Sequence, residues 1–260
     1  MTGRIHVDGQ DVTTLGKEEL SAFRGRIVSM IFQEPMLALD PVYTLGQQIT
    51  EAICRHMGVS QQEAREQAFR LFERVRIPSP QRRLDAYPHE MSRGMRQRAM
   101  IALALACQPK VLLADEPTTA LDATVQIQIL LLLRELQREF GLSVIFVTHN
   151  IGVAVEIADR IAVMYAGHVV ETGSVEDVLH RPQHPYTRGL LGARVERIKK
   201  GERLSTIPGS PPDLANLTSG CSFAPRCVLA NDECRKAAPA LSSVGHAHEV
   251  ACFQAGHKVS

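Results

Sequence analysis

The sequence has 260 residues, of which 45% are hydrophobic, enough for one large or two small domains with a buried core. Its 29 lysine and arginine residues nearly balance 28 aspartate and glutamate residues, so the net charge of +1 provides no electrostatic footprint for nucleic acid. The longest largely apolar stretches, such as Ile127 to Leu133, are far shorter than the roughly 20 residues that cross a bilayer, and no signal peptide pattern occurs, so we expect a cytoplasmic protein.

The first predicted elements are a hairpin, a strand and a group of helices. Residues 3–12 read as two short strands around the turn Asp8-Gly9, a dipeptide typical of hairpins, and the apolar run 27–32 predicts a strand. Three segments with helical periodicity then predict a helical subdomain over residues 44–107. These segments are 44–57, 61–75 and 92–107.

Two continuous apolar runs, 111–114 and 144–147, lie on either side of a predicted helix over residues 122–140. This strand-helix-strand order is typical of a parallel sheet that is buried on both faces, so the predicted fold class is α/β. Ligands of such sheets bind beyond the carboxyl ends of the strands.

The remaining sequence predicts a change of organisation near residue 181. Strands over residues 161–165 and 168–171 and a short helix over 175–180 come first. Proline, glycine, cysteine and short polar stretches then follow. We therefore predict one domain over residues 1–180 and a small irregular domain over residues 181–260.

Two adjacent acids, Asp115 and Glu116, follow the apolar run 111–114 and should lie at the ligand edge of the sheet. An aspartate there can hold hydrated magnesium bound to phosphate oxygens, and a glutamate one residue later can polarise an attacking water. Acids after a strand are also common helix caps, so the pair alone leaves its function open.

The surroundings of the acid pair carry a family resemblance. Residues 117–122 (PTTALD) follow directly, Thr148-His149 ends the next strand, and Gln33 ends an earlier one within residues 32–35 (FQEP). In this order the motifs resemble the ATP-binding subunits of ABC transporters along almost the whole chain. The resemblance implies a P-loop NTPase-like nucleotide-binding domain, incomplete at its N-terminus, with an inserted helical subdomain.

The same resemblance implies roles for individual residues and the ligands ATP and Mg²⁺. Asp115 would hold magnesium together with Gln33, and Glu116 would be the catalytic base. His149 would touch the γ-phosphate and hold the attacking water. Gln33 would also couple the site to the membrane, and Asp122 belongs to the loop that contacts the partner subunit.

One departure from the family is the lack of any G-x-x-x-x-G-K-S/T stretch in the sequence. In the family this loop supplies the backbone N–H groups, the helix N-terminus and the lysine that neutralise the β- and γ-phosphates. We therefore expect negligible ATP binding by the chain as written, and we interpret its start as a truncation or a misplaced start codon. The alternative to an active subunit is a catalytically silent or pseudogene-like one that cannot bind its own ATP.

A second departure lies in residues 91–95 (MSRGM), which correspond to the family's signature Leu-Ser-Gly-Gly-Gln. In the family this loop caps the γ-phosphate of ATP held by the opposite subunit, a role that would fall here to Ser92 and Gly94. Arg93 stands where the family has glycine, and its side chain either obstructs that approach or attracts phosphate. Ser92 alone is explained equally well as a helix N-cap.

Residues 181–191 (RPQHPYTRGLL) resemble a segment that follows the nucleotide domain in importers of the oligopeptide, dipeptide and nickel group. The resemblance implies a peptide importer with a second ATP-binding subunit, two transmembrane permease subunits and an extracytoplasmic solute-binding protein. Attachment would be peripheral, at the cytoplasmic face of the inner membrane. Peptide, nickel and glutathione stay open as solutes, and a soluble ABC ATPase acting on DNA or ribosomes is disfavoured because the chain has no basic excess.

Six cysteines fall into two groups. Cys54 and Cys107 lie in apolar helical stretches and are interpreted as small buried hydrophobes. The other four, with spacing C-x5-C-x6-C-x17-C, are Cys221, Cys227, Cys234 and Cys252. Four thiols in a cytoplasmic chain favour a metal or cluster over disulfides. Some members of the importer group carry an iron-sulfur cluster on four such cysteines, so we expect a 4Fe-4S centre, with zinc or unliganded thiols as alternatives.

Overall fold

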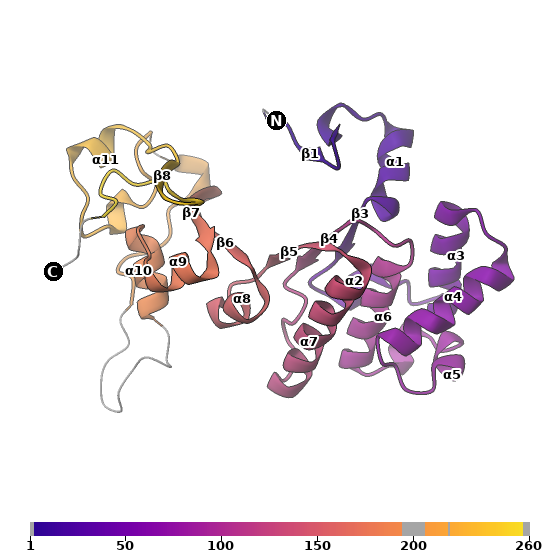
Figure 1. The fold of residues 1–260 in the computed structure, drawn as a ribbon. Coiled ribbons are helices and arrows are strands. Elements are labelled where there is room, and N and C mark those ends of the chain that lie inside the picture. Colours follow the sequence, from indigo (N-terminus) through magenta and orange to yellow (C-terminus); the bar gives the residue numbers. More distant parts are fainter. Residues whose placement is uncertain (1–2, 194–205, 218, 257–260) are drawn as a thin grey trace. The chain divides into compact units, whose positions relative to one another are not determined.

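The computed structural model describes residues 3–193, 206–217 and 219–256 (Figure 1). Contacts within the chain divide it into two compact units, Met1–His149 and Asn150–Ser260, which we call the N-terminal and C-terminal units. The predicted domain boundary near residue 181 lies inside the C-terminal unit. The two units are described separately below.

The N-terminal unit contains the predicted hairpin, helical subdomain and parallel strands. Its elements in chain order are β1 (His6–Val7), β2 (Gln10–Asp11), α1 (Lys17–Arg26), β3 (Val28–Ile31), α2 (Pro35–Ala38), α3 (Leu45–Met57), α4 (Gln61–Arg74), α5 (Pro80–Leu84), α6 (Arg93–Leu105), β4 (Val111–Asp115), α7 (Ala123–Phe140) and β5 (Ser143–Val147). Helices α1, α2 and α5 were not predicted, because α1 buries only Phe23 and the other two are too short to show helical periodicity.

The three parallel strands form a sheet in the order β3-β4-β5 (Figure 1), and the parallel pairing of β4 and β5 is the one that their apolar runs predicted. The register pairs Ile31 with Ala114 and Asp115 with Val147, so the carboxyl ends of all three strands meet at one edge. Leu112 and Ala114 lie on one face of the central strand and are buried, whereas Ile145 and Val147, on the opposite face of the sheet, are 57% and 50% exposed. The prediction of a sheet buried on both faces is therefore wrong within the described residues.

The helical subdomain has well-defined helix starts. The Thr44 hydroxyl accepts from the Gln47 N–H at 3.3 Å, and the Gln47 side chain accepts from the Thr44 N–H at 2.9 Å. Ser60 and Glu63 repeat this reciprocal capping at the start of α4. The apolar faces of these helices bury side chains such as Phe72, which is fully inaccessible to solvent. Local capping and periodicity therefore explain why the sequence located these helices closely.

The C-terminal unit contains more regular structure than the sequence predicted. Its elements are α8 (Ile151–Ile157), β6 (Arg160–Tyr165), β7 (His168–Ser174), α9 (Val175–His180), α10 (Pro185–Gly192), α11 (Asp232–Lys236), β8 (Ser242–Gly245) and β9 (His248–Val250). Of these, β6, β7 and α9 match predicted elements, whereas α8 and the helices and strands after residue 181 were not predicted. Helix α10 forms there because Pro185 suits the first helical position and His184 caps the helix.

The strands of the C-terminal unit form an antiparallel sheet in the order β6-β7-β9-β8. Glu171 in β7 pairs with Val250 in β9, so a strand from the end of the chain completes a sheet that begins before residue 181. Val163, Tyr165, Val170, Val178 and Phe223 form the core beside it. Across the described ranges, no helix combines the length and apolarity needed to cross a membrane.

Candidate functional site

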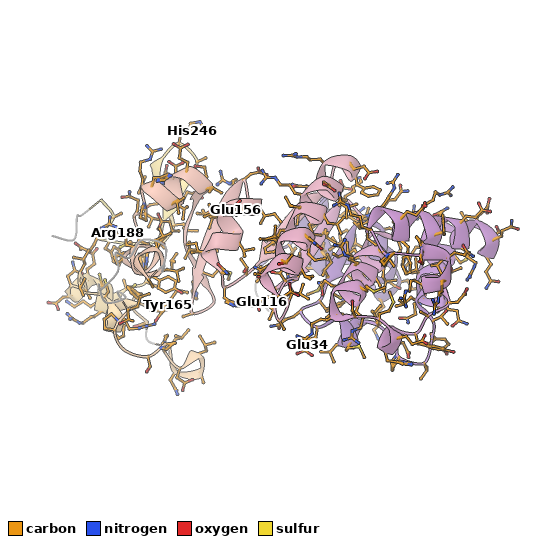
Figure 2. All side chains as sticks on the ribbon, turned by 90° about the horizontal axis from the view of Figure 1, so that it is seen from below. Glu34, Glu116, Glu156, Tyr165, Arg188 and His246 are labelled. Atoms are coloured by element: carbon orange, nitrogen blue, oxygen red, sulfur yellow. The ribbon has the colours of Figure 1, made fainter. Side chains whose placement is uncertain are left out.

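Three side chains from distant parts of the chain meet at the carboxyl edge of the parallel sheet. Gln33 follows β3, Glu116 follows β4 and His149 follows β5. The Gln33 amide Nε2 donates to Glu116 Oε2 at 3.1 Å, and His149 Nδ1 lies 3.0 Å from Glu116 Oε1. Glu116, labelled in Figure 2, is therefore the centre of a hydrogen-bond network.

The loop over residues 116–122 shapes this network. Glu116 has a φ of 44°, in the left-handed region that non-glycine residues rarely adopt. Its N–H donates to the Val147 carbonyl at 3.0 Å, which anchors the turn to β5. Thr119, which the sequence analysis did not single out, donates from Oγ1 to Glu116 Oε2 at 2.8 Å. The sequence signal for this contact was the position of the threonine three residues after the glutamate, because a turn there brings its hydroxyl close to the carboxylate.

The network keeps Glu116 ionised. Its hydrogen bond with His149 is the main cause that lowers the pKa of Glu116 below its usual value of 4.5, and the hydrogen bond from Thr119 acts in the same direction. An ionised carboxylate only accepts hydrogen bonds, so Nδ1 of His149 carries the proton in this pair. The His149 side chain is 74% exposed, which leaves its ring accessible to a ligand at this edge.

Asp115, the predicted magnesium residue, is the last residue of β4 and lies at the same edge, paired with Val147. It is half-buried, and the hydrogen bonds from Gln33, Thr119 and His149 go to its neighbour Glu116 instead. The position and the hard carboxylate oxygens suit a hydrated magnesium ion.

Ser92 and Asp122 are both helix N-caps in the structure. Ser92 Oγ accepts from the Met95 N–H at 3.3 Å at the start of α6, and Asp122 Oδ1 accepts from the Val125 N–H at 2.9 Å at the start of α7. A Cβ added to Gly94 would lie 3.1 Å from Val125 Cγ1, so the first turns of α6 and α7 touch there. A structural role therefore exists for each of these residues beside any role at a nucleotide.

The four C-terminal cysteines line one small cavity in the C-terminal unit, together with His184 and Phe223. These cysteines, all free thiols, are Cys221, Cys227, Cys234 and Cys252. The cavity volume is about 10 Å³, room for about one water molecule. Within the residues that the structure describes, no group of three or more His, Cys, Asp or Glu side chains is arranged to hold a metal ion. The thiols would therefore have to rearrange around any metal or cluster.

Burial controls the ionisation of three of these thiols. It raises the pKa of Cys221 and Cys227, and it raises the pKa of Cys252 to about 11. Burial also lowers the pKa of the His184 imidazole, which lines the same cavity, to about 4. The thiols of Cys221, Cys227 and Cys252 and the imidazole of His184 are thus neutral near pH 7.

A buried acid that the sequence analysis missed supports this unit. Glu171 is fully buried, and its Oε1 accepts from the Gln183 N–H at 2.7 Å and lies 2.8 Å from His248 Nε2. Its Oε2 accepts from the His184 N–H at 3.0 Å. The sequence signal for this buried acid was its place among the apolar residues of β7. The residues that satisfy Glu171 lie 12 to 77 residues away in the sequence.

Comparisons with known proteins agree with this geometry. Residues 1–119 match the family model "ABC transporter", and residues 170–234 match "Oligopeptide/dipeptide transporter, C-terminal region". A putative peptide import ATP-binding protein of Brucella melitensis is 52% identical over 250 residues, which cover 94% of this chain and 74% of that protein. A probable peptide ABC transporter ATP-binding protein of Sinorhizobium fredii is 48% identical over 259 residues, which cover 99% of this chain and 77% of that protein.

Solved structures give the same result. The ATP-binding cassette MJ0796, in a dimeric post-hydrolysis state bound to ADP and Pi, is 30% identical, with a TM-score of 0.60 over 67% of this chain and 74% of its own. The cbiO1 subunit of Clostridium perfringens is 28% identical, with a TM-score of 0.61 over 69% of each chain. The fold is therefore the α/β nucleotide-binding fold of ATP-binding cassettes. Within that class, the chain belongs to the family of ATP-binding subunits of oligopeptide/dipeptide ABC transporters.

Proposed function

We propose that this chain is the energy-coupling subunit of an ABC importer for peptides and that ATP hydrolysis at its Glu116 edge drives solute uptake. The observation that carries the proposal is the hydrogen-bond network in which Gln33, Thr119 and His149 converge on an ionised Glu116. Its position beyond the carboxyl ends of parallel strands is where such folds bind nucleotides. The close similarity to peptide import proteins supports peptides as the solute.

In this proposal Glu116 is the general base. Its lowered pKa keeps it ready to accept a proton from the attacking water at neutral pH. Gln33 and Thr119 hold one carboxylate oxygen, and His149 contacts the other, so the orientation of the base is fixed before the substrate binds. The exposed ring of His149 holds the attacking water and contacts the terminal phosphate.

Asp115 and Gln33 would hold magnesium at the same edge. When bound, the ion supplies charge neutralisation at the phosphate oxygens. Ser92, Gly94 and Asp122 would contact the nucleotide and loop of a second ATP-binding subunit. The pattern G-x-x-x-x-G-K-S/T does not occur in residues 1–260, so these residues would supply the water-activating edge and the signature surface but not the phosphate-binding loop.

The surface beside Gln33 suits contact with permease subunits. Large apolar side chains are exposed there, and Leu37 is 82% exposed. They are Phe32, Met36, Leu37, Val42 and Tyr43. Contact through this surface with two transmembrane permease subunits would place the chain peripherally at the cytoplasmic face of the inner membrane, with solute delivered by an extracytoplasmic binding protein.

The test is solute-stimulated ATP hydrolysis by the assembled transporter in lipid vesicles. We expect binding protein loaded with a short peptide to stimulate phosphate release, because closure of the two ATP-binding subunits is coupled to the permease. Binding protein loaded with nickel or glutathione distinguishes the other solutes. A transporter that hydrolyses no ATP at this chain's site under any of these conditions would contradict the proposal and favour a silent subunit.

We further propose that the four cysteines hold a 4Fe-4S cluster. All four thiols line one cavity, none forms a disulfide, and four thiolates are the usual ligand set of such a cluster. The cluster would contribute a rigid cross-link between segments that are otherwise joined by short loops. The cysteines lie on segments as far apart as residues 221 and 252, so one group would tie the C-terminal unit together.

Protein purified without oxygen is expected to be brown and to contain iron and acid-labile sulfide. Replacing any one of the four cysteines with serine should lower the iron content by at least about half, because a serine hydroxyl is a poor ligand for iron. Cys54→Ser, in α3, is the matched control and should retain the iron of the unmodified protein. Colourless, iron-free protein would contradict the cluster, and stoichiometric zinc would replace it with a zinc site.

A further inference from the structure

The side chain of Arg93 crosses from the signature segment to the loop that carries Glu116. Its Nη1 donates to the carbonyl oxygen of Ala120 at 2.6 Å. Arg93 is the first residue of α6, and Ala120 lies in the loop between β4 and α7. The sequence left open whether this arginine blocks a nucleotide or attracts one. In the structure its guanidinium instead binds its own chain.

The loop is hydrogen-bonded at both ends and through Thr119, whose N–H donates to the Glu116 carbonyl at 3.0 Å, but it is held less firmly at Ala120 and Leu121. At one end the Glu116 N–H donates a hydrogen bond to the Val147 carbonyl, and at the other end Asp122 caps α7. Between them, Ala120 has a φ of 62°, a conformation that costs free energy for a residue with a Cβ. The nearby hydrogen bond from the Leu121 N–H to the Thr118 carbonyl is long, at 3.3 Å.

The hydrogen bond from Arg93 adds a strong contact at Ala120, where the loop is held less firmly. A hydrogen bond from a guanidinium is stronger than one between neutral groups, and it fixes the direction of the Ala120 carbonyl. The Arg93 side chain can reach Ala120 because the close contact of Gly94 with Val125 brings the first turn of α6 against α7. Glycine at position 93 has no side chain to make this bond, and a lysine could make it only with an ammonium group on a more flexible stem.

We propose that Arg93 is a positioning residue that clamps the loop over residues 116–122 and thereby holds Glu116 in its hydrogen-bonded orientation. The clamp acts within one subunit, from the N-terminus of α6 to the loop beside the catalytic edge. Its consequence for turnover rests on the proposed function, namely hydrolysis at Glu116. The clamp itself is a property of the folded chain and can be measured without nucleotide.

The experiment compares Arg93→Ala, Arg93→Gly and Arg93→Lys in two measurements. Amide hydrogen exchange of residues 118–121 in the nucleotide-free chain should become roughly tenfold faster in Arg93→Ala and Arg93→Gly, and less so in Arg93→Lys. In the assembled transporter, kcat should fall several-fold with little change in the KM for ATP, because the arginine orients the base and does not hold substrate. Arg70→Ala, which removes an exposed arginine of α4, is the control for both measurements.

Each result decides the proposal. Unchanged exchange in Arg93→Ala would overturn the clamp. Faster exchange with an unchanged or higher kcat, above all in Arg93→Gly, would overturn its positioning role. A rise in KM at constant kcat would assign Arg93 to nucleotide binding instead. If the unmodified transporter hydrolyses no ATP, the proposed function fails, while the exchange measurement still decides the clamp.

Discussion

Replacing Glu116 with glutamine is expected to slow ATP hydrolysis at this site by roughly 10²- to 10⁴-fold, because a neutral amide cannot accept the proton of the attacking water. Glutamine has the same shape, so its amide oxygen can still accept from Gln33 and Thr119. Its NH₂ group can donate to Nδ1 of His149 once the imidazole adopts the tautomer that carries its proton on Nε2. The local structure should therefore persist while the chemistry stops. The rate is measured as phosphate release from the assembled transporter.

The control for this substitution is Glu135→Gln. Glu135 lies on α7, is 56% exposed and pairs with Arg76, so the change removes one carboxylate without touching the edge of the sheet. It should retain the rate of the unmodified protein. The apparent affinity for ATP should be similar in all three proteins, since Glu116 contacts side chains that orient it. A Glu116→Gln transporter that kept more than about a third of its rate would remove Glu116 as the base.

Replacing Glu171 with alanine is expected to destabilise the C-terminal unit by about 3–5 kcal/mol, because it leaves several buried donors without an acceptor. The backbone N–H groups of Gln183 and His184 and the imidazole of His248 all lose their partner. These groups join β7 to the start of α10 and to β9. The free energy of unfolding is measured by urea denaturation, followed through the amide NMR signals of β7 and β9.

Two further variants make this result specific. Glu171→Gln retains an oxygen that can accept from one or two of the donors, so its loss should be smaller than that of alanine. Glu249→Ala removes an exposed carboxylate from β9 itself and should change the free energy of unfolding by no more than about 0.5 kcal/mol. A loss below about 1 kcal/mol for Glu171→Ala would contradict a structural role for the buried network.

The candidate edge was predictable because its residues occupy the ends of strands. In a parallel sheet, carboxyl ends meet at one edge whatever the sequence distance between strands, so Gln33, Glu116 and His149 could be placed together. Thr119 and the clamp from Arg93 could not be predicted in the same way. The first depends on the left-handed turn at Glu116, and the second on how closely α6 packs against α7.

The C-terminal unit was harder to predict for a related reason. Helix α10 and strands β8 and β9 are short, so periodicity hardly distinguishes them from loops. Strand β9 exists because it pairs with β7, and the buried Glu171 is satisfied by residues far along the chain. Contacts within the chain divide it between residues 149 and 150.

The sequence by itself determined the fold class, the helix starts of the helical subdomain, the resemblance to ABC transporter subunits, and the acid pair Asp115 and Glu116. These follow from local patterns, such as apolar runs, capping residues and motif order, which are encoded within a few residues. Only the tertiary structure decided where Arg93 binds, which oxygen of Glu116 each neighbour holds, and that the four cysteines share one cavity. Such contacts depend on packing between segments that are distant in sequence, and no local pattern encodes that packing.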